Sequence, residues 1–168
     1  MAQIRFATAE DLGRLGECEV QIWESLREWL PDSFVSPNIN NIQRAEYLQN
    51  WQQMLQNREV IYLLAEKDKE IIGLATGRVR EDGVGMLGFL GIKKECRREG
   101  VGSQLLNRFL EEAKKRNAHK VWLFTSPNLH SAIGLYVKMG FVPEGYMRRH
   151  SYGLDLIIYS KFLNEWER

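Results

Sequence analysis

The chain has 168 residues, a typical length for one domain that excludes two full catalytic domains. Hydrophobic residues make up 44% and charged residues 27% of it, a globular composition that excludes a disordered or collagen-like chain. The formal net charge is +1, but the segment Lys93–Lys120 carries nine basic and four acidic residues. This uneven distribution predicts an anionic ligand, either nucleic acid or a phosphorylated small molecule.

Targeting segments, membrane spans and metal motifs are not expected. The longest apolar runs, Val60–Ala65 and Met86–Ile92, are much shorter than the ~20 residues of a transmembrane helix. The first twelve residues lack the basic and then apolar pattern of a secretory signal. The two cysteines, Cys18 and Cys96, stand outside any metal-ligand spacing. We therefore expect a cytoplasmic protein with no membrane association and no metal.

The first third of the chain predicts a short strand and two helices. Ile4 and Phe6 alternate with polar neighbours, as in a strand. Apolar residues then recur at helical spacing over Leu12–Trp29, until Pro31 stops the pattern. A polar turn around Pro37 is expected next, followed by a second helix over about residues 41–57.

The rest of the chain predicts a sheet with a crossover helix. Three apolar runs joined by charged turns indicate an antiparallel meander. They are followed by a helix from Gly100, a strand, a second helix and closing strands, which predicts a parallel, right-handed crossover in an α/β domain. The expected elements are strands over Val60–Ala65, Ile71–Val79, Val84–Ile92 and Val121–Thr125, a helix over Leu129–Met139, and closing strands over Phe141–Val142 and Tyr146–Tyr159.

Two glycine-rich segments are candidates for binding a phosphate, and only one of them stands in the right structural context. Gly83–Gly88 matches a dinucleotide-binding fingerprint but continues as an extended run instead of opening a helix, so a hairpin is the better interpretation. Arg97–Ser103 does stand between a strand and a helix. Glycines at a helix start let backbone amides approach a phosphate, and the helix dipole favours the anion. Because the Gly-Lys-Ser/Thr ending is absent, the segment suits binding a diphosphate more than hydrolysing one, and an ordinary helix start with a basic flank is the alternative.

A second segment, Ala132–Phe141, reads Ala-Ile-Gly-Leu-Tyr-Val-Lys-Met-Gly-Phe. Together with Arg97–Gly102, it resembles the GNAT superfamily of acyl-CoA-dependent N-acetyltransferases. That family has Arg/Gln-x-x-Gly-x-Gly/Ala after its fourth strand and Ala-x-x-Leu-Tyr-x-Lys-x-Gly-Phe later. The likeness extends to Ile4–Asp11 and Glu70–Gly73, and so covers essentially the whole chain. It implies a single GNAT-like domain over residues 1–168, of class α/β (α+β): a mixed, mostly antiparallel sheet with helices on both faces and a splayed central strand pair that binds acetyl-CoA.

The resemblance also implies a cofactor site, carried over position by position. Its members are Leu90, Gly91 and Ile92 along the pantetheine arm, Arg97, Arg98, Gly100, Val101, Gly102 and Ser103 around the pyrophosphate, and Lys138 at the 3′-phosphate. Asn128 stands one place before the position where the family often has asparagine, which is Leu129 here, and is expected to substitute for it. Tyr136 is expected to act as general acid toward the departing thiolate, and a tyrosine packed in the core is its alternative.

The acceptor implied by the resemblance is a primary amine of a small molecule or peptide, acetylated by direct transfer in a ternary complex. Glu24 or Glu28 is the candidate base, and Trp23 and Glu28 are the candidate substrate contacts. A solvated helix face and core packing are the simpler explanations for these residues. Glu19 lies at the edge of the apolar face, where it is either paired or directed toward the cleft.

Two other classes of function remain open from the sequence. A non-catalytic acyl-CoA-binding or regulatory module of the same fold would bind the cofactor without needing Tyr136. Nucleic-acid binding through Lys93–Lys120 ranks last because four glutamates interrupt that segment, so no nucleic-acid partner is expected. Exposed closing strands would permit a homodimer.

Overall fold

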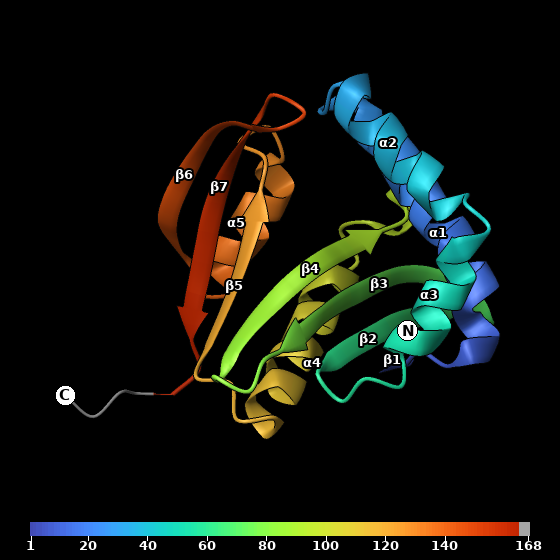
Figure 1. Ribbon diagram of the computed structural model, residues 1–168, viewed down its shortest axis with the longest axis horizontal. Helices are drawn as coiled ribbons and strands as arrows, with labels where there is room; N and C mark the ends of the chain where they lie inside the picture. Colours follow the sequence, from blue (N-terminus) through green and yellow to red (C-terminus); the bar gives the residue numbers. More distant parts are fainter. Residues whose placement is uncertain (165–168) are drawn as a thin grey trace.

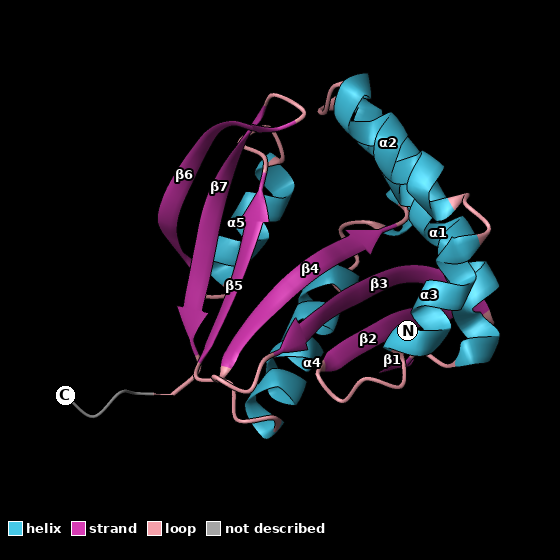
Figure 2. Cartoon of the chain, viewed as in Figure 1, coloured by secondary structure: helices cyan, strands magenta, loops and turns pink. Residues whose placement is uncertain are grey.

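In the computed structural model, which describes residues 1–164, one seven-stranded sheet carries helices on both of its faces (Figure 1). The strand order is β1-β2-β3-β4-β5-β7-β6, and all neighbouring pairs are antiparallel except β4 and β5. The expected α/β class, with a mixed and mostly antiparallel sheet, is therefore confirmed. Figure 2 shows how the helices separate into an N-terminal group and a group that follows the meander.

The element boundaries follow the sequence pattern closely in the second half of the chain. The strands are β1 Gln3–Phe6, β2 Val60–Lys67, β3 Glu70–Val79, β4 Val84–Ile92, β5 Lys120–Thr125, β6 Val142–Ser151 and β7 Leu154–Phe162. The helices are α1 Leu12–Ser25, α2 Asp32–Ile42, α3 Glu46–Met54, α4 Val101–Lys115 and α5 His130–Lys138, with short 3-10 turns η1 Ala9–Asp11, η2 Leu26–Glu28 and η3 Lys94–Cys96. None of the helices within residues 1–164 combines the length and the apolar character needed to cross a bilayer.

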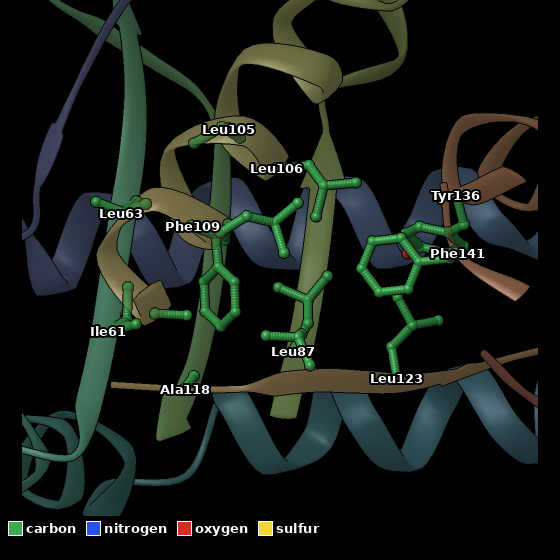
Figure 3. Packing of buried hydrophobic residues seen from close by; sticks show 14 of the residues in the cluster. Ile61, Leu63, Leu87, Leu105, Leu106, Phe109, Ala118, Leu123, Tyr136 and Phe141 are labelled. Carbon is green, nitrogen blue, oxygen red and sulfur yellow. The ribbon is translucent and has the colours of Figure 1, made fainter. Parts of the chain in front are cut away.

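Strand β2 explains why helices cover both faces. All six residues from Val60 to Ala65 are buried, and alternate side chains point to opposite faces of a strand. Ile61 and Leu63 join the core beneath α4, whereas Tyr62 and Leu64 join the core beneath α1. Figure 3 shows the first of these cores, in which α4 packs over β2 and β4. Burying one large aliphatic or aromatic side chain contributes about 1.5–3 kcal/mol, so the two layers hold the sheet in place from both sides.

The N-terminal helices differ from their prediction. Helix α1 ends at Ser25 and not at Trp29, and η2 continues the chain. The expected polar turn around Pro37 is wrong, because α2 runs through this proline. The reason is a buried stripe at i, i+4 and i+7 (Val35, Ile39 and Ile42), whose burial outweighs the cost of a proline inside a helix.

The helix expected over residues 41–57 is shorter, since Ile42 belongs to α2 and α3 covers Glu46–Met54. Leu48 of the expected apolar stripe is 44% exposed, and Tyr47 is the buried residue of α3 instead.

The expected single strand over Tyr146–Tyr159 is also wrong. The chain reverses at Tyr152 and Gly153 and returns as β7, antiparallel to β6. Both turn residues have positive φ, +50° and +76°, the combination that a tight hairpin turn with the right-handed twist of its strands requires. Asparagine or aspartate normally occupies the first of these positions, so tyrosine there concealed the turn.

Candidate active site

The site begins where the two parallel strands at the centre of the sheet separate. Val84–Met86 of β4 pair with Lys120–Trp122 of β5, and beyond these three pairs the strands diverge (Figure 1). Leu87–Ile92 and Leu123–Thr125 therefore have no ladder between them. The register of β4 against β3 shifts by one residue and leaves Gly88 unpaired, and such a bulge bends a strand away from its neighbour. The splayed strand pair implied by the family resemblance is confirmed. The region between the diverging parts of β4 and β5 is called the splay below.

The backbone of β4 is free on one side in this region. Leu90, Gly91 and Ile92 pair with β3 on one edge and have no strand opposite them on the β5 edge within the described part of the chain. Gly91 must lack a side chain, because a Cβ there would lie 2.8 Å from the side chains of both Ile22 and Phe89. An extended ligand chain can hydrogen-bond to such an edge as an additional strand does.

The loop after β4 presents backbone amides at the start of α4. Arg98 and Gly100 have left-handed φ values of +65° and +81°, which turn the chain tightly into the helix. The Gln104 amide donates the first hydrogen bond of α4, to the Gly100 carbonyl at 3.1 Å. The amides of residues 101–103 precede that bond and have no acceptor within the helix. Together with the helix dipole, these donors form an arrangement suited to a phosphate.

Helix α5 packs close to these amides. A Cβ added to Gly102 would lie 3.4 Å from the Leu135 side chain and 3.8 Å from that of Ile92, so the start of α4, the end of β4 and α5 meet at this glycine. Val101 points into the core at 3% exposure and Ser103 is half-buried, so Val101 offers a ligand only its backbone. Lys138 is exposed in the last turn of α5.

Tyr136 of α5 lies in the core, on the β5 and β7 side of the diverging strands. Its ring is buried beside Phe141 and Tyr159, with centroids 5.9 and 6.4 Å away, and Figure 3 places it next to Leu123 of β5. The Tyr136 hydroxyl makes no hydrogen bond within residues 1–164. It is nevertheless not among the fully enclosed polar atoms that lack a partner, since in these residues only the Tyr62 hydroxyl is of that kind. The Tyr136 oxygen is therefore not fully enclosed, although its ring is part of the core. Burial raises the pKa of this phenol to about 12, which keeps it protonated at neutral pH.

Two residues expected to contact the cofactor direct their side chains elsewhere. Arg97 donates through Nε to the Ile92 carbonyl at 3.0 Å and through Nη2 to Ser25 Oγ at 2.5 Å. Asn128 donates through Nδ2 to the Trp29 carbonyl at 3.2 Å. Arg98, in contrast, is exposed and has no side-chain partner within the described residues, which leaves its charge available to an anion.

The basic segment Lys93–Lys120 carries less free charge than its composition indicates. Most of its cations are engaged, and the ion pairs are Lys93–Glu70, Lys94–Glu28, Arg108–Glu112, Lys115–Glu112 and Lys120–Glu144. Arg116 donates instead to the carbonyls of Arg58 and Val60. Paired charges attract a polyanion weakly. Within the described residues, Arg98 before α4 and Lys114 in its last turn are the cations of this segment left without a hydrogen-bond or ion-pair partner, so Arg98 is the one available at the start of α4.

The candidate acceptor residues lie on α1 and η2. Glu24 accepts from Arg27 at 2.6 Å, and this hydrogen bond lowers the pKa of Glu24, which weakens it as a base. Glu28 is exposed, with Lys94 Nζ 3.4 Å from its carboxylate. Trp23 packs on Phe34 and Phe89, with ring centroids 5.9 and 5.5 Å away.

The helices α1 and α2, with η2 between them, form one wall beside the splay. The sequence analysis missed several residues that pack against this wall. Leu129, before α5, and Leu154, at the start of β7, pack against the small core of α2 that also holds Trp23 and Phe34. Tyr152 meets Phe34 edge-on at a centroid distance of 6.2 Å, which brings the β6–β7 turn onto α2. Nothing in the sequence indicates these contacts, because the partners of each residue are about one hundred positions away along the chain.

Glu19 is paired and does not stand free. Tyr47 donates to its carboxylate at 2.6 Å, while burial raises the pKa of Glu19 above its ordinary value. His119, His130 and His150 remain apart, and within residues 1–164 no three histidine, cysteine or acidic side chains gather as a metal site would require.

The fold and this site define an acetyltransferase of the GNAT class. The family model described as acetyltransferase (GNAT) family matches residues 23–141, which include the splay and both motifs, and the chain belongs to this family. Among curated proteins it is 28% identical over 167 residues to a putative [ribosomal protein bS18]-alanine N-acetyltransferase of Bacillus subtilis, covering 98% of this chain and 97% of that one.

Solved structures share the whole fold. The PaiA N-acetyltransferase of Thermoplasma acidophilum, in complex with coenzyme A, superposes with a TM-score of 0.83 at 21% identity, covering 96% of this chain and 99% of that one. The acetyltransferase YncA of Salmonella typhimurium, described as putative and solved with acetyl-CoA, gives a TM-score of 0.79 at 19% identity over 100% and 97% of the two chains. At these identities the similarity establishes the fold.

Proposed function

We propose that this protein binds acetyl-CoA at the splay and transfers its acetyl group directly to a primary amine of a small molecule or peptide. The observation that carries the proposal is that the free edge of β4, the unpaired amides at the start of α4, and α5, the helix of Tyr136, meet at Gly102. The relatives support it, since one is named as a putative [ribosomal protein bS18]-alanine N-acetyltransferase and two solved ones contain coenzyme A or acetyl-CoA. Both cysteines are free thiols, in keeping with work in the cytoplasm.

The residues present suit acetyl-CoA. The amides of residues 101–103 and the Arg98 guanidinium would bind the pyrophosphate, and the exposed Lys138 would bind the 3′-phosphate. The free edge of Leu90, Gly91 and Ile92, apart from the Ile92 carbonyl that accepts from Arg97, would hydrogen-bond the pantetheine arm. This assignment uses the backbone of the loop for the anion, and it leaves the Arg97 side chain for a separate role.

The chemistry follows from where the proton sources lie. The amine nitrogen forms a bond to the thioester carbonyl carbon, and the carbon–sulfur bond breaks as the tetrahedral intermediate collapses. The Tyr136 hydroxyl gives its proton to the departing sulfur, and its raised pKa ensures that the proton is present. Glu28 or water accepts the proton that the ammonium loses. Holding both reactants in one complex supplies much of the rate enhancement.

A thiol-release assay tests the proposal. Acetyl-CoA is supplied with polyamines, aminoglycosides, amino acids and peptides that begin with alanine, and wild type is compared with Tyr136→Phe. We expect one acceptor class to give thiol release and kcat to fall about 10²-fold in the variant, as the loss of a general acid does. Tyr159→Phe, which removes a hydroxyl from the neighbouring buried ring, is the matched control and should retain kcat. Tight acetyl-CoA binding with no release from any acceptor would instead favour a non-catalytic binding module.

A further inference from the structure

Two residues expected from the sequence to bind the cofactor reach the same short segment, Ser25–Trp29, from opposite sides. Arg97 follows the end of β4, and its guanidinium carbon lies 5.8 Å from the centre of the Trp29 ring in addition to its bonds to Ile92 and Ser25. Asn128 follows the end of β5 and hydrogen-bonds the Trp29 carbonyl. Because β4 and β5 diverge toward these ends, the Ser25–Trp29 segment connects the two sides of the splay.

The Arg97 contacts are well defined chemically. Ser25 Oγ donates to the Ile22 carbonyl at 2.6 Å and accepts from Arg97, so both functions of this hydroxyl are used and its direction is fixed. The Arg97 side chain is half-buried, and its Nε donates a hydrogen bond to the Ile92 carbonyl. A planar fork that satisfies two acceptors and lies near an aromatic ring cannot be reproduced by lysine.

The same segment also belongs to the wall on which the acceptor would lie. Leu30, immediately after it, is buried in the small core of α2 that includes Trp23 and Phe34. Lys94 and Glu28 add an exposed ion pair between the loop after β4 and η2. Arg97 and Asn128 therefore add hydrogen bonds, one from each side of the diverging strands, to the apolar packing of this wall against Leu129, Leu154 and Tyr152.

We propose that Arg97 and Asn128 are positioning residues for the acceptor and not ligands of acetyl-CoA. They hold Ser25–Trp29 across the diverging ends of β4 and β5, so that the wall carrying Trp23 and Glu28 faces the acetyl group. The proposal rests on the proposed function, and it assigns different roles to the two adjacent arginines of the segment Arg97–Ser103. Arg98 and the helix amides bind the anion, whereas Arg97 fixes the acceptor side.

The kinetic test compares adjacent arginines. Arg97→Met should raise the KM for the acceptor about tenfold, as the loss of charge-assisted hydrogen bonds does, while the dissociation constant for acetyl-CoA changes less than twofold. Arg97→Lys should not restore the acceptor KM. Arg98→Met, the matched control from the same loop, should weaken acetyl-CoA binding and leave the acceptor KM unchanged. Arg97→Met combined with Trp29→Leu should cost less than the two single changes added together, because they act on one contact.

A second measurement does not need turnover. Amide hydrogen exchange in residues 25–30 should accelerate at least severalfold in Arg97→Met and in Asn128→Ala, but not in Arg98→Met. The proposal is overturned if exchange in this segment is unchanged, or if Arg97→Met weakens acetyl-CoA binding as strongly as Arg98→Met with the acceptor KM intact. Failure of the wild-type protein to bind acetyl-CoA would instead refute the proposed function, and the exchange result would still decide whether Arg97 orders the segment.

Discussion

Replacing Gly100 by alanine isolates the reason for a glycine at the start of α4. A Cβ built there meets no heavy atom within 4 Å, so space does not require glycine. The backbone does, because φ is +81°, a left-handed conformation that costs an L-residue about 1–2 kcal/mol. Gly100→Ala should lower the free energy of unfolding by that amount and reduce Tm by about 2–8 °C for a chain of this size. Because the same conformation orients the helix amides, acetyl-CoA should also bind more weakly.

Gly134 provides the matched control. A Cβ there also meets nothing within 4 Å, but Gly134 lies inside α5 with an ordinary helical φ. Alanine is favoured over glycine in a helix by up to about 1 kcal/mol, so Gly134→Ala should raise Tm and leave acetyl-CoA affinity unchanged. Circular dichroism melts and calorimetric titration of the two variants test this pair. Tm shifts of the same sign in both would refute the reasoning that φ, and not space, selects glycine at position 100.

Asp11 and Glu19 should give opposite pH dependences of stability. Bidentate hydrogen bonds from Arg5 at 2.8 Å hold the pKa of Asp11 well below its usual range, so its contribution is complete above the unfolded pKa near 4 and declines as the pH falls below it. Asp11→Asn should cost about 2 kcal/mol at pH 7, measured by urea unfolding, and less at pH 3. Burial raises the pKa of Glu19, so the folded state favours its protonated form and stability is lost as the pH rises through that pKa. Glu19→Gln should therefore gain stability relative to wild type between pH 4 and pH 8, and a pH-independent difference would contradict this.

The parts of the site made by the backbone could be predicted from the sequence. A glycine pair at a helix start fixes where the amides of α4 lie, and its position between a strand and a helix is local information. The place of Tyr136 on a helix was likewise predicted, whereas its role as general acid comes from the resemblance of Ala132–Phe141 to the GNAT motif and stays a prediction.

The directions of side chains that depend on distant partners could not be predicted. Arg97 turns toward Ser25, 72 positions earlier, and Asn128 toward Trp29, 99 positions earlier. No periodicity carries such information. The same limit applies to Pro37, where the burial of Val35 and Ile39 against other elements overrides a strong local signal against helix.

The short junction between β4 and β5 leaves the distance between the two half-sheets at the other end of these strands to be set by other contacts. Three residue pairs join them at one end, and the six residues from Leu87 to Ile92 extend from that junction for about 20 Å at ~3.3 Å per residue. A rotation of about 5° at the junction moves the far end by about 2 Å, a lever action that breaks none of the ladder on either side. Away from this junction the two halves are joined by side-chain contacts, which include the Asn128–Trp29 hydrogen bond and the ring contact of Phe34 with Tyr152. The width available to an inserted chain is thus set by these side chains and not by the backbone ladder.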